Sequence, residues 1–501
     1  MDVRDILDPR PHLAGQVALI HHGRQFTYQA LSDQVDRLAH GLSKQLACGE
    51  LLAIWMPNGP EIICLYLACL KTGIVPMPLH QGMKGPEVRQ ILSYARARLL
   101  IVSTPLMERL AGDLADTGIE RVYAVGSGAM APGCHRYADL AHGQATSLRV
   151  RTAAEDMAFV LHTSGSEGQP KGVMLSYRNL NHILDFRLGH TRLGPDSISV
   201  MASCLTQSVG LHQSLALLAA GGRLVLLDDY DIDQMVSAIH RHRPTHLIMV
   251  VNAFDRLLDH PALRADSLAH VRFAAVGADQ VTPRVQERYM ALTGKPLNVS
   301  YGLTESSWAL VNLEGRPDKC LALGKPGPGV EIRLVDRHGR ETATGETGEI
   351  LIRSPRTMLG YLHNAELTQQ AYVDGWLASG DLAYRDEDGY FWFAGRKKHI
   401  IVLSSGDTVS PLEVERAMLG HPAVDQCVVL AAAADGSEVP WAYVSVTDAS
   451  LSETALQAYL RERISDYKVP HRIILVAEMP VGLTGKVRRH SHAVPNPYPD
   501  G

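Results

Sequence analysis

The sequence predicts an α/β protein in which parallel sheets make up most of the chain. Short runs that are apolar at every position recur along it, and segments with helical periodicity lie between them. Such runs suit strands that helices cover on both faces, which is typical of parallel sheets. The chain has 501 residues, which is too long for a single hydrophobic core of ordinary size. About three domains or subdomains are therefore expected.

Each predicted element follows from a local pattern. Residues 51–56 read LLAIWM and predict a strand that ends at Pro57. Residues 59–71 carry apolar residues at helical spacing and predict a helix. Further strands are predicted at residues 99–102, 121–125, 157–161, 223–227, 246–251, 273–276, 349–353, 424–431 and 442–446, and a second helix at 456–464.

Composition and charge exclude several classes of protein. The net charge is −5, without a basic block, so we expect no nucleic-acid partner. The apolar stretches are far shorter than the ~18 residues of a membrane segment, and no signal peptide is visible. Seven cysteines without a C-x-x-C pair predict neither a zinc site nor a disulfide framework, so we expect a soluble, cytoplasmic protein. Three histidines are expected at a helix end and in the core, not at a metal: His240, His242 and His246.

The loop between Leu161 and Val173, LHTSGSEGQPKGV, carries the most chemical information. Its glycines allow backbone N–H groups to approach an anion, its hydroxyls add donors, and its lysine adds a point charge. This combination predicts a cradle for a polyphosphate, with a spacing that differs from the P-loop. The alternative is a flexible surface turn. The candidate phosphate-binding residues are Thr163, Ser164, Gly165, Ser166, Gly168 and Lys171.

This loop resembles the phosphate-binding signature of the adenylate-forming superfamily, which includes acyl-CoA synthetases, luciferases and the adenylation domains of peptide synthetases. Four further segments resemble that family's signatures and follow in its order. The resemblance implies a large N-terminal domain of αβαβα layers with a small β-barrel-like subdomain, and a small, mobile α+β C-terminal domain. It places these domains at residues 1–394 and 399–489, with a hinge at 395–398, and residues 490–501 are expected to form a flexible tail.

The second signature lies at residues 301–306, YGLTES. The resemblance implies that Tyr301 stacks on adenine, that Thr304 touches the α-phosphate and that Glu305 holds Mg²⁺, for which a carboxylate oxygen is a suitable ligand. Without the family, Thr304 is a candidate helix N-cap. The same resemblance adds four residues along the adenine and the acyl group: Gly277, Ala278, Asp279 and Gly302.

The third and fourth signatures are DGWLASGDL at residues 374–382 and the basic segment GRKKH that follows. In the third, Asp381 would bind both ribose hydroxyls with its two oxygens; the alternative is an acidic hairpin turn. In the fourth, Arg396 would contact the ribose or a phosphate and Lys398 would be the pivot; the alternative is a solvated basic turn. Many relatives carry an acidic residue where His399 stands, so it receives no role.

The fifth signature is PVGLTGKVRR near the C-terminus, in which Lys486 matches the family's catalytic lysine. When a carboxylate attacks the α-phosphate, negative charge builds on the oxygens, and a desolvated ammonium stabilises it. The alternative is a solvated lysine in a basic tail.

Residues 202–210, ASCLTQSVG, bear on the acid that is activated. Relatives that activate amino acids keep an aspartate here for the substrate ammonium, and Thr206 stands in its place. An unpaired buried ammonium is costly, so an α-amino acid is disfavoured. The candidate acyl pocket consists of Thr206, Gln207, Ser208 and Gly302. Whether the three polar side chains bind the acid or face a loop stays open.

The resemblance implies a reaction in two steps. A carboxylic acid attacks ATP to give an acyl-adenylate and pyrophosphate, and a thiol then takes the acyl group and releases AMP. ATP and Mg²⁺ are the expected cofactors, and the thiol is that of CoA or, as the alternative, the phosphopantetheine of a carrier protein. A nucleotide-binding regulator without catalysis is a rival of another class, and oxidative luminescence is a third possibility on this scaffold.

Overall fold

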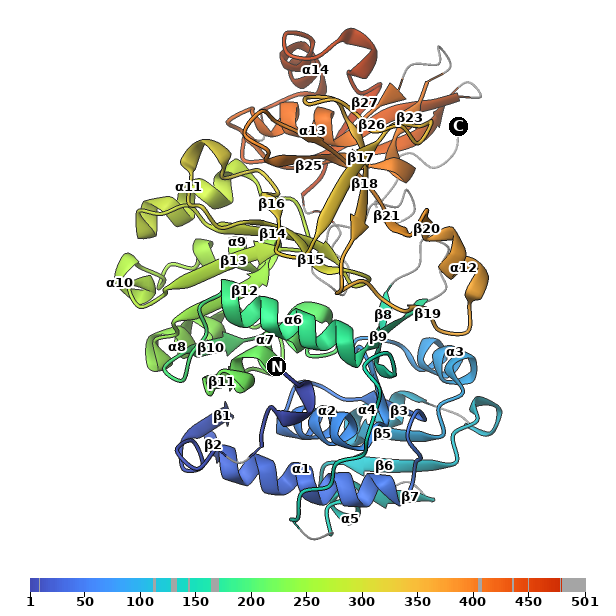
Figure 1. Cartoon of the computed structure of the whole chain (residues 1–501). Coiled ribbons are helices and arrows are strands. Elements are labelled where there is room, and N and C mark those ends of the chain that lie inside the picture. The colour runs from blue at the N-terminus through green and yellow to red at the C-terminus, as the bar shows by residue number, and fades with distance from the viewer. Residues whose placement is uncertain are drawn as a thin grey trace. The chain divides into compact units, whose positions relative to one another are not determined.

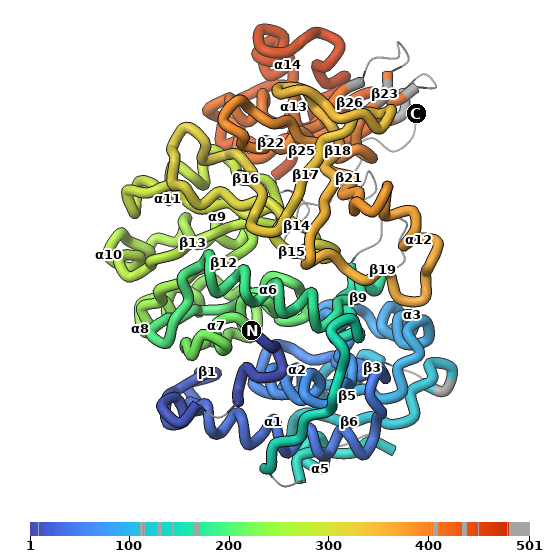
Figure 2. The backbone as a smooth tube through the Cα atoms, in the orientation of Figure 1, coloured from blue at the N-terminus to red at the C-terminus, as the bar shows by residue number. Residues whose placement is uncertain are grey.

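The computed structural model describes residues 1–8, 10–110, 114–127, 133–142, 145–163, 171–403, 408–434, 437–448, 450–477 and 479 (Figure 1). The chain divides into two compact units, whose path Figure 2 traces. Unit 1 comprises Met1–Leu321, Pro326–Glu331 and Ile352–Leu377, and unit 2 comprises Ala322–Lys325, Ile332–Leu351 and Ala378–Gly501. The expected hinge at 395–398 stays a prediction.

The first sheet of unit 1 is entirely parallel, in the order β4-β3-β5-β6-β7. Its strands are β3 (Leu51–Trp55), β4 (Val75–Leu79), β5 (Leu99–Ser103), β6 (Arg121–Val125) and β7 (Cys134–Arg136). The helices between them are α2 (Pro60–Thr72), α3 (Gly85–Ala95) and α4 (Thr104–Met107), and α5 (Tyr137–Leu140) follows. The strands and the helix predicted for this region are confirmed.

The second sheet of unit 1 runs in the order β15-β14-β13-β12-β10-β11-β1-β2. Its strands are β1 (Val17–His21), β2 (Arg24–Thr27), β10 (Ile198–Met201), β11 (Arg223–Leu226), β12 (His246–Val250), β13 (Phe273–Gly277), β14 (Asn298–Leu303) and β15 (Ser307–Asn312). The pairs from β14 through to β1 are parallel, whereas β15 pairs antiparallel with β14 and β2 pairs antiparallel with β1. The predicted strands at 223–227, 246–251 and 273–276 are confirmed.

Helices cover both faces of this second sheet. The helices of unit 1 include α1 (Tyr28–Ser43), α6 (Tyr177–His190), α7 (Ser208–Ala219), α8 (Ile232–His242), α9 (Val251–Asp259), α10 (Ala265–Leu268) and α11 (Pro283–Thr293). Leu247 and Met249 of β12 pack in one apolar cluster with α8, α9 and α11. Ile248, which alternates with them, packs in another cluster with Phe186 of α6 and Val209 of α7. The expectation of parallel strands buried on both faces is confirmed.

A small antiparallel sheet, β19-β9-β8, completes unit 1. Its strands are β8 (Met157–Thr163), β9 (Lys171–Ser176) and β19 (Gly360–Tyr361), followed by α12 (Ala365–Gln370) and β20 (Tyr372–Val373). Ser176 ends β9 and caps α6, because its hydroxyl accepts a hydrogen bond from the backbone N–H of Asn179.

Unit 2 contains most of a five-stranded sheet and an α+β region with its own core. The sheet contains β17 (Glu331–Val335), β18 (Gly348–Arg353), β21 (Trp376–Arg385), β22 (Phe391–Arg396) and β20. The α+β region contains β23 (Ile401–Val402), β24 (Thr408–Val409), α13 (Pro411–Leu419), β25 (Val424–Ala434), β26 (Ser437–Val446), α14 (Glu453–Arg461) and β27 (Arg472–Leu475). Its apolar core takes residues from both helices and from β23 to β27. The large α/β part and the small α+β part agree with the predicted fold class, and the mobility of the small part stays a prediction.

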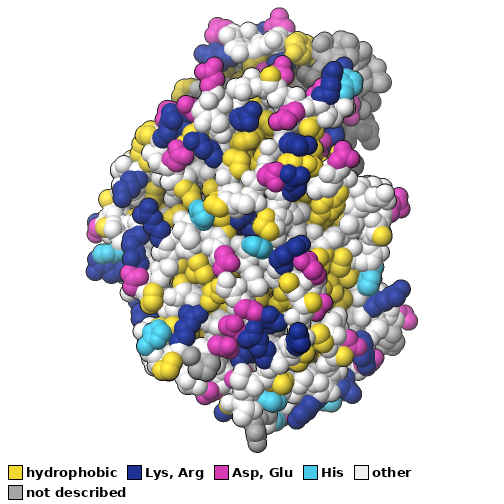
Figure 3. All heavy atoms as spheres, in the orientation of Figure 1, with side chains coloured by type: hydrophobic (Ala, Val, Ile, Leu, Met, Phe, Trp, Pro, Cys, Tyr) yellow, Lys and Arg dark blue, Asp and Glu magenta, His cyan; other side chains and the backbone are white. Residues whose placement is uncertain are grey.

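The remaining elements are short. They are the two-residue strand β16 (Lys325–Pro326) and several 3-10 turns along the chain. The turns lie at Val3–Asp5, Glu108–Leu110, Ala115–Thr117, Pro317–Lys319, Lys397–His399 and Asp466–Lys468. Within the described part of the chain, no helix has both the length and the apolar character needed to cross a bilayer. Acidic and basic side chains are interspersed on the face that Figure 3 shows.

Candidate active site

Two of the predicted motifs meet in unit 1. The phenol of Tyr361 donates a hydrogen bond of 2.9 Å to Glu305 Oε1, and Lys171 Nζ lies 5.5 Å from the centre of the Tyr361 ring. Lys171 belongs to the predicted phosphate loop and Glu305 to the second motif. The fold therefore brings an ammonium and a carboxylate from distant parts of the sequence to the same tyrosine.

Strand pairing explains this meeting. Lys171 begins β9 and pairs with Thr163 at the end of β8, while the other edge of β9 pairs with β19, which carries Tyr361. The backbone N–H of Met358 donates a hydrogen bond of 2.7 Å to the carbonyl oxygen of Glu305, which ties the second motif to the segment before β19. The other predicted loop residues, Ser164, Gly165, Ser166 and Gly168, lie outside the described residues.

The carboxylate of Glu305 affects two phenols. Burial, and then the charge of Glu305, raises the pKa of Tyr361 far above its usual value. The same causes raise the pKa of Tyr372 to about 12. Both phenols are protonated at neutral pH, so the Tyr361 hydroxyl is a donor toward Glu305.

The C-terminal ends of β13 and β14 carry the next group of predicted residues. Gly277 pairs with Ser300 on the neighbouring parallel strand, so Gly277 and Tyr301 lie at the sheet edge where α/β proteins bind ligands. A Cβ on Gly277 would lie 2.6 Å from the carbonyl oxygen of Ser300, and a Cβ on Gly302 would lie 1.8 Å from a carbonyl oxygen of β15. Only glycine fits at these two positions, and Ala278 follows with a positive φ of 70°.

The segments after these two strands are turns. The chain turns at Thr304 and continues as β15, so the described structure has no helix for Thr304 to cap. Asp279 is exposed, and its Oδ1 accepts a hydrogen bond of 2.8 Å from the backbone N–H of Gln280. Thr304 and Asp279 both lie just beyond strand ends of the second sheet, and their contacts with the nucleotide stay predictions.

The candidate acyl-pocket residues connect β10 to α7. Thr206 is buried, and its hydroxyl lies 2.9 Å from Cys204 Sγ. Gln207 precedes α7 and Ser208 begins it. Because β10 runs parallel to β12, and β12 to β13 and β14, these residues follow the same edge of the sheet as Gly277 and Tyr301.

In unit 2 the third and fourth motifs form one paired site. Asp381 lies opposite Arg396 in the pairing of β21 with β22, and Arg396 Nε lies 2.9 Å from Asp381 Oδ1. The Asp381 side chain is buried, whereas Arg396 is exposed at the end of its strand. Glu349 supports the pair in two ways. It accepts a hydrogen bond from the backbone N–H of Gly380, and its Oε2 forms an ion pair of 2.7 Å with Lys397 Nζ.

The structure places some other residues and leaves one out. Lys398 and His399 lie in the 3-10 turn after β22, whereas Lys486 lies outside the described residues. His240 and His242 lie in the last turn of α8, and His246 is buried on β12, where its Nε2 lies 2.7 Å from the carbonyl oxygen of Thr191. The three histidines therefore lie at a helix end and in the core, as expected.

Sequence reasoning missed the partner of Glu305 and a buried cationic group. Tyr361 has no local signal, since it acts through a residue 56 positions away. Arg187 and Arg356 are almost fully buried. For Arg187 a signal exists, because it continues the apolar stripe of Leu180 and Ile183 along the inner face of α6.

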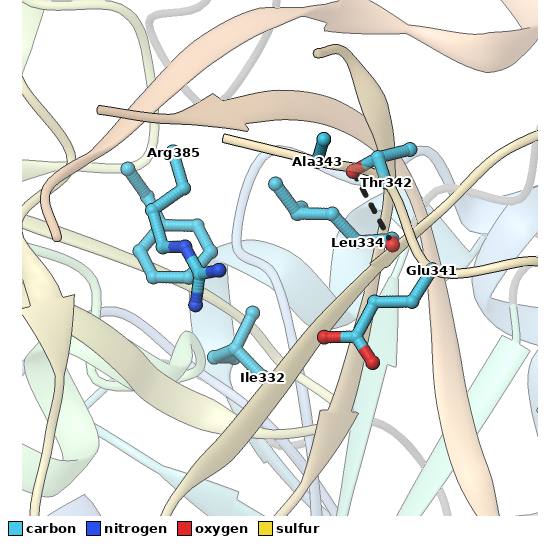
Figure 4. Close-up of a pocket in the computed structure, with 7 residues that line it drawn as sticks. Ile332, Leu334, Glu341, Thr342, Ala343 and Arg385 are labelled. Atoms are coloured by element: carbon cyan, nitrogen blue, oxygen red, sulfur yellow. Dashed lines mark hydrogen bonds between the residues drawn. The ribbon is translucent and has the colours of Figure 1, made fainter. Parts of the chain in front are cut away.

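Two other features lie apart from the predicted residues. The Nε2 atoms of His21 and His22 lie 2.7 and 3.0 Å from the two oxygens of Asp228, a partly exposed cluster of a kind that holds metals. A pocket in unit 2 is lined by apolar side chains together with Glu341, Thr342 and Arg385 (Figure 4), and Thr342 donates a hydrogen bond to a backbone carbonyl there. None of the predicted site residues lines this pocket.

Comparison with known proteins identifies the family. The sequence profile described as "AMP-binding enzyme" matches residues 11–362, and that of the "AMP-binding enzyme C-terminal domain" matches residues 413–486. The chain belongs to the AMP-binding enzyme family. It is 31% identical to a feruloyl-CoA synthase of Amycolatopsis sp. over 94% of both chains. It is also 31% identical to the medium-chain fatty-acid–CoA ligase of Escherichia coli K12, over 94% of this chain and 85% of that one.

Solved structures agree with this assignment. ATP-bound MatB from Rhodopseudomonas palustris superposes with a TM-score of 0.90 at 26% identity, over 97% of both chains. The amide bond synthetase McbA from Marinactinospora thermotolerans superposes with a TM-score of 0.89 at 28% identity, over 98% of both. The predicted family, fold class and enzyme class are confirmed: the chain is an AMP-forming acid–thiol ligase, which activates a carboxylic acid with ATP and forms a thioester with CoA.

Proposed function

We propose that Lys171 and Glu305 act on the phosphates of ATP, with Tyr361 holding the carboxylate in place. The observation that carries this proposal is the meeting of Lys171, Tyr361 and Glu305 in unit 1. Lys171, with Thr163 and the hydroxyls and glycines at positions 164, 165, 166 and 168, contacts the β- and γ-phosphates. Thr304 contacts the α-phosphate.

Glu305 is the residue that would hold Mg²⁺. Its carboxylate offers the hard oxygen ligand that this ion prefers, and it comes from a turn at the sheet edge where the nucleotide would bind. Bound Mg²⁺ would neutralise part of the phosphate charge. Tyr361 orients the carboxylate through Oε1.

The other residues receive roles in binding the nucleotide. Tyr301 stacks on the adenine, and the tight backbone at Gly277 and Gly302 lets the nucleotide approach the sheet edge. The positions 278 and 279 line the same edge. Asp381 binds the ribose hydroxyls while Arg396, already paired with it, contacts the ribose or a phosphate. Charged donors and acceptors make the stronger class of hydrogen bonds.

Two lysines have roles in the first half-reaction and in the domain movement that follows it. Lys486 stabilises the charge that develops as the acid attacks the α-phosphate, and Lys398 is the pivot of the small domain. We propose that the enzyme works in the cytoplasm, where ATP and CoA are available. This location fits its seven cysteines, which are all free thiols.

The finer identity of the acid and of the physiological acceptor is part of the proposal. The relatives include ligases named for feruloyl, medium-chain fatty, indoleacetate, sulfoacetate and hydroxybenzoate groups, so the likeness alone favours no acid. We propose Thr206, Gln207, Ser208 and Gly302 as the wall of the acyl pocket. CoA is the preferred acceptor, with a carrier-protein phosphopantetheine as the alternative.

The test separates the two half-reactions. ATP–pyrophosphate exchange across fatty, aryl, hydroxy and amino acids measures adenylation, and AMP release with CoA or with candidate carrier proteins measures transfer. Lys171→Ala and Glu305→Gln should each abolish most exchange, while Lys325→Ala, a lysine outside the proposed site, serves as the control. If no acid supports exchange, a nucleotide-binding regulator becomes the better explanation. Transfer of the acyl group to carrier proteins but not to CoA would make the carrier-protein phosphopantetheine, and not CoA, the acceptor.

A further inference from the structure

A buried group of cations lies between α6 and the segment before β19. Arg187 and Arg356 are 1% and 2% exposed. The Arg187 guanidinium lies 3.4 Å from the centre of the Trp308 ring, and that of Arg356 lies 4.1 Å from the centre of the Phe186 ring. The two rings pack edge-to-face at 6.4 Å. The two arginines and two aromatic rings form one group, which we term the arginine cluster.

The arginine cluster lacks the partners that buried charges require. Among the residues that the structure describes, Nε and Nη1 of Arg187 and Nε and Nη2 of Arg356 have no hydrogen-bond partner. His212 of α7, whose pKa responds to the charge of Arg187, is equally buried, and its two ring nitrogens have no hydrogen-bond partner among the described residues. A buried charge is normally paired with an opposite charge, because leaving it alone costs several kcal/mol. The stacked rings offset only part of that cost.

The two arginines keep their charge at neutral pH. Burial, and then the charge of Arg356, lowers the pKa of Arg187 to about 9, and burial lowers the pKa of Arg356 to about 10. Burial, and then the charge of Arg187, lowers the pKa of His212 to about 3. Because the imidazole of His212 is neutral and both guanidinium groups are charged, this buried group of side chains has a net positive charge.

The arginine cluster adjoins the proposed acyl pocket. Trp308 pairs with Gly302 across β14 and β15. It also packs in one apolar cluster with Val209 in the first turn of α7 and Ala275 of β13. Arg356 is held in position, because the amide of Asn179 donates hydrogen bonds of 2.9 Å to the carbonyl oxygens on either side of it. The cations therefore lie next to residues that would line the far end of the acyl pocket.

We propose that Arg187 and Arg356 bind a second acidic group on the carboxylic acid that this enzyme activates. The substrate class is then an acid with a carboxylate or sulfonate at the end remote from the reacting carboxyl. The planar guanidinium suits such a group, since it donates two parallel hydrogen bonds to its oxygens. This inference rests on the proposed acyl pocket and names the chemistry of its far end.

Pyrophosphate exchange with matched acids tests the inference on the wild-type enzyme. The pairs are hexanoate with adipate and benzoate with terephthalate, which differ only by the second carboxylate. At least one diacid should exceed its monoacid in kcat/KM by about tenfold or more, because a site with buried polar groups rejects an analogue that leaves them unpaired. Monoacids that work as well as every diacid would overturn the inference and leave adenylation intact. Exchange with no acid at all would overturn both.

Variants show whether the arginine cluster is responsible. In Arg187→Met, the ratio of diacid to monoacid kcat/KM should fall by about tenfold. Arg178→Met serves as the matched control, since Arg178 lies on the same helix but is half exposed and paired with Glu155, and its ratio should match the wild type. An unchanged ratio in folded Arg187→Met contradicts the inference. If that variant does not fold, Arg187→Lys, which keeps the charge but loses the planar fork, should still lower the ratio.

A free anion is the competing occupant. If chloride rather than the substrate fills the arginine cluster, added NaCl should raise monoacid exchange and abolish the diacid preference. That result would overturn the inference. A diacid preference that persists when chloride is raised supports the substrate as the source of the anion.

Discussion

The first and second sheets of unit 1 have buried charges beside them that are treated in opposite ways. Beside the first sheet, Lys71 of α2 is 3% exposed, and its Nζ lies 2.7 Å from the buried carboxylate of Asp36 on α1. Asp8 adds a second carboxylate at 3.6 Å. Beside the second sheet, the guanidinium groups of Arg187 and Arg356 carry no such partner within the described chain.

The difference separates a structural charge from a functional one. Lys71 and Asp36 neutralise each other inside the protein, so the pair needs nothing from outside and joins two helices. The arginine cluster is neutralised only when something else enters. In unit 1, predicted site residues such as Gly277 and Tyr301 lie at strand ends of the second sheet, and none lies at strand ends of the first. The unpaired charges are therefore beside the sheet where a ligand is expected.

The largest effect is expected from breaking the paired charge. Asp36→Ala leaves Lys71 buried without its main partner and should lower the free energy of unfolding by about 3–5 kcal/mol. Urea unfolding followed by circular dichroism measures it. Asp33→Ala on the same helix, which loses only a surface contact with Gln29, should cost less than about 1 kcal/mol. If both variants lost the same free energy of unfolding, the buried ion pair would contribute no more to stability than a surface contact.

Removing the unpaired charge should have the opposite sign. Arg187→Met keeps an apolar stem against Trp308 and deletes the guanidinium, so without substrate it should raise the free energy of unfolding by about 1–4 kcal/mol. Thermal and urea unfolding of the ligand-free enzyme measure the change. A loss of several kcal/mol would mean that Arg187 is satisfied inside the protein, and the contrast with Lys71 would disappear.

The pH dependence of stability sharpens the same contrast. The folded-state pKa of His212 is about 3, below the unfolded value of about 6.5. The unfolded chain therefore binds more protons between these values, and this contribution to stability is present above pH 6.5 and is lost as pH falls. Between pH 7 and pH 5 the wild type should lose about 2 kcal/mol more than His212→Leu. If the free energy of unfolding changed with pH in the same way in both proteins, the low folded-state pKa of His212 would be refuted.

The smallest effect concerns a pair in the proposed phosphate site. Tyr361→Phe removes the hydrogen bond to Glu305 Oε1 while keeping the ring beside Lys171. A hydrogen bond of this kind contributes about 1–3 kcal/mol, so kcat/KM for ATP in pyrophosphate exchange should fall by about tenfold and the Mg²⁺ requirement should rise. Tyr372→Phe, whose hydroxyl binds a backbone carbonyl, is the control. Equal kinetics of Tyr361→Phe and wild type would remove Tyr361 from the site.

The elements were largely predictable because their signals are local. An apolar run such as residues 51–56 buries as a strand in any α/β context, and Ser176 caps a helix through a neighbour three residues on. The site was predictable only as separate motifs. Nothing near Glu305 in the sequence indicates Tyr361, and nothing near Arg356 indicates that a second arginine shares its surroundings.

The sequence by itself determined the order of strands and helices, the phosphate loop, the four other motifs and hence the family, since each is a pattern of a few consecutive residues. The tertiary structure decided which of those residues meet. β9 brings Lys171 to Tyr361 because it pairs with β19, and α6 turns Arg187 inward because its apolar stripe must cover the sheet. Burial and strand pairing over long sequence distances set the partner of each charge, and a local pattern carries no record of them.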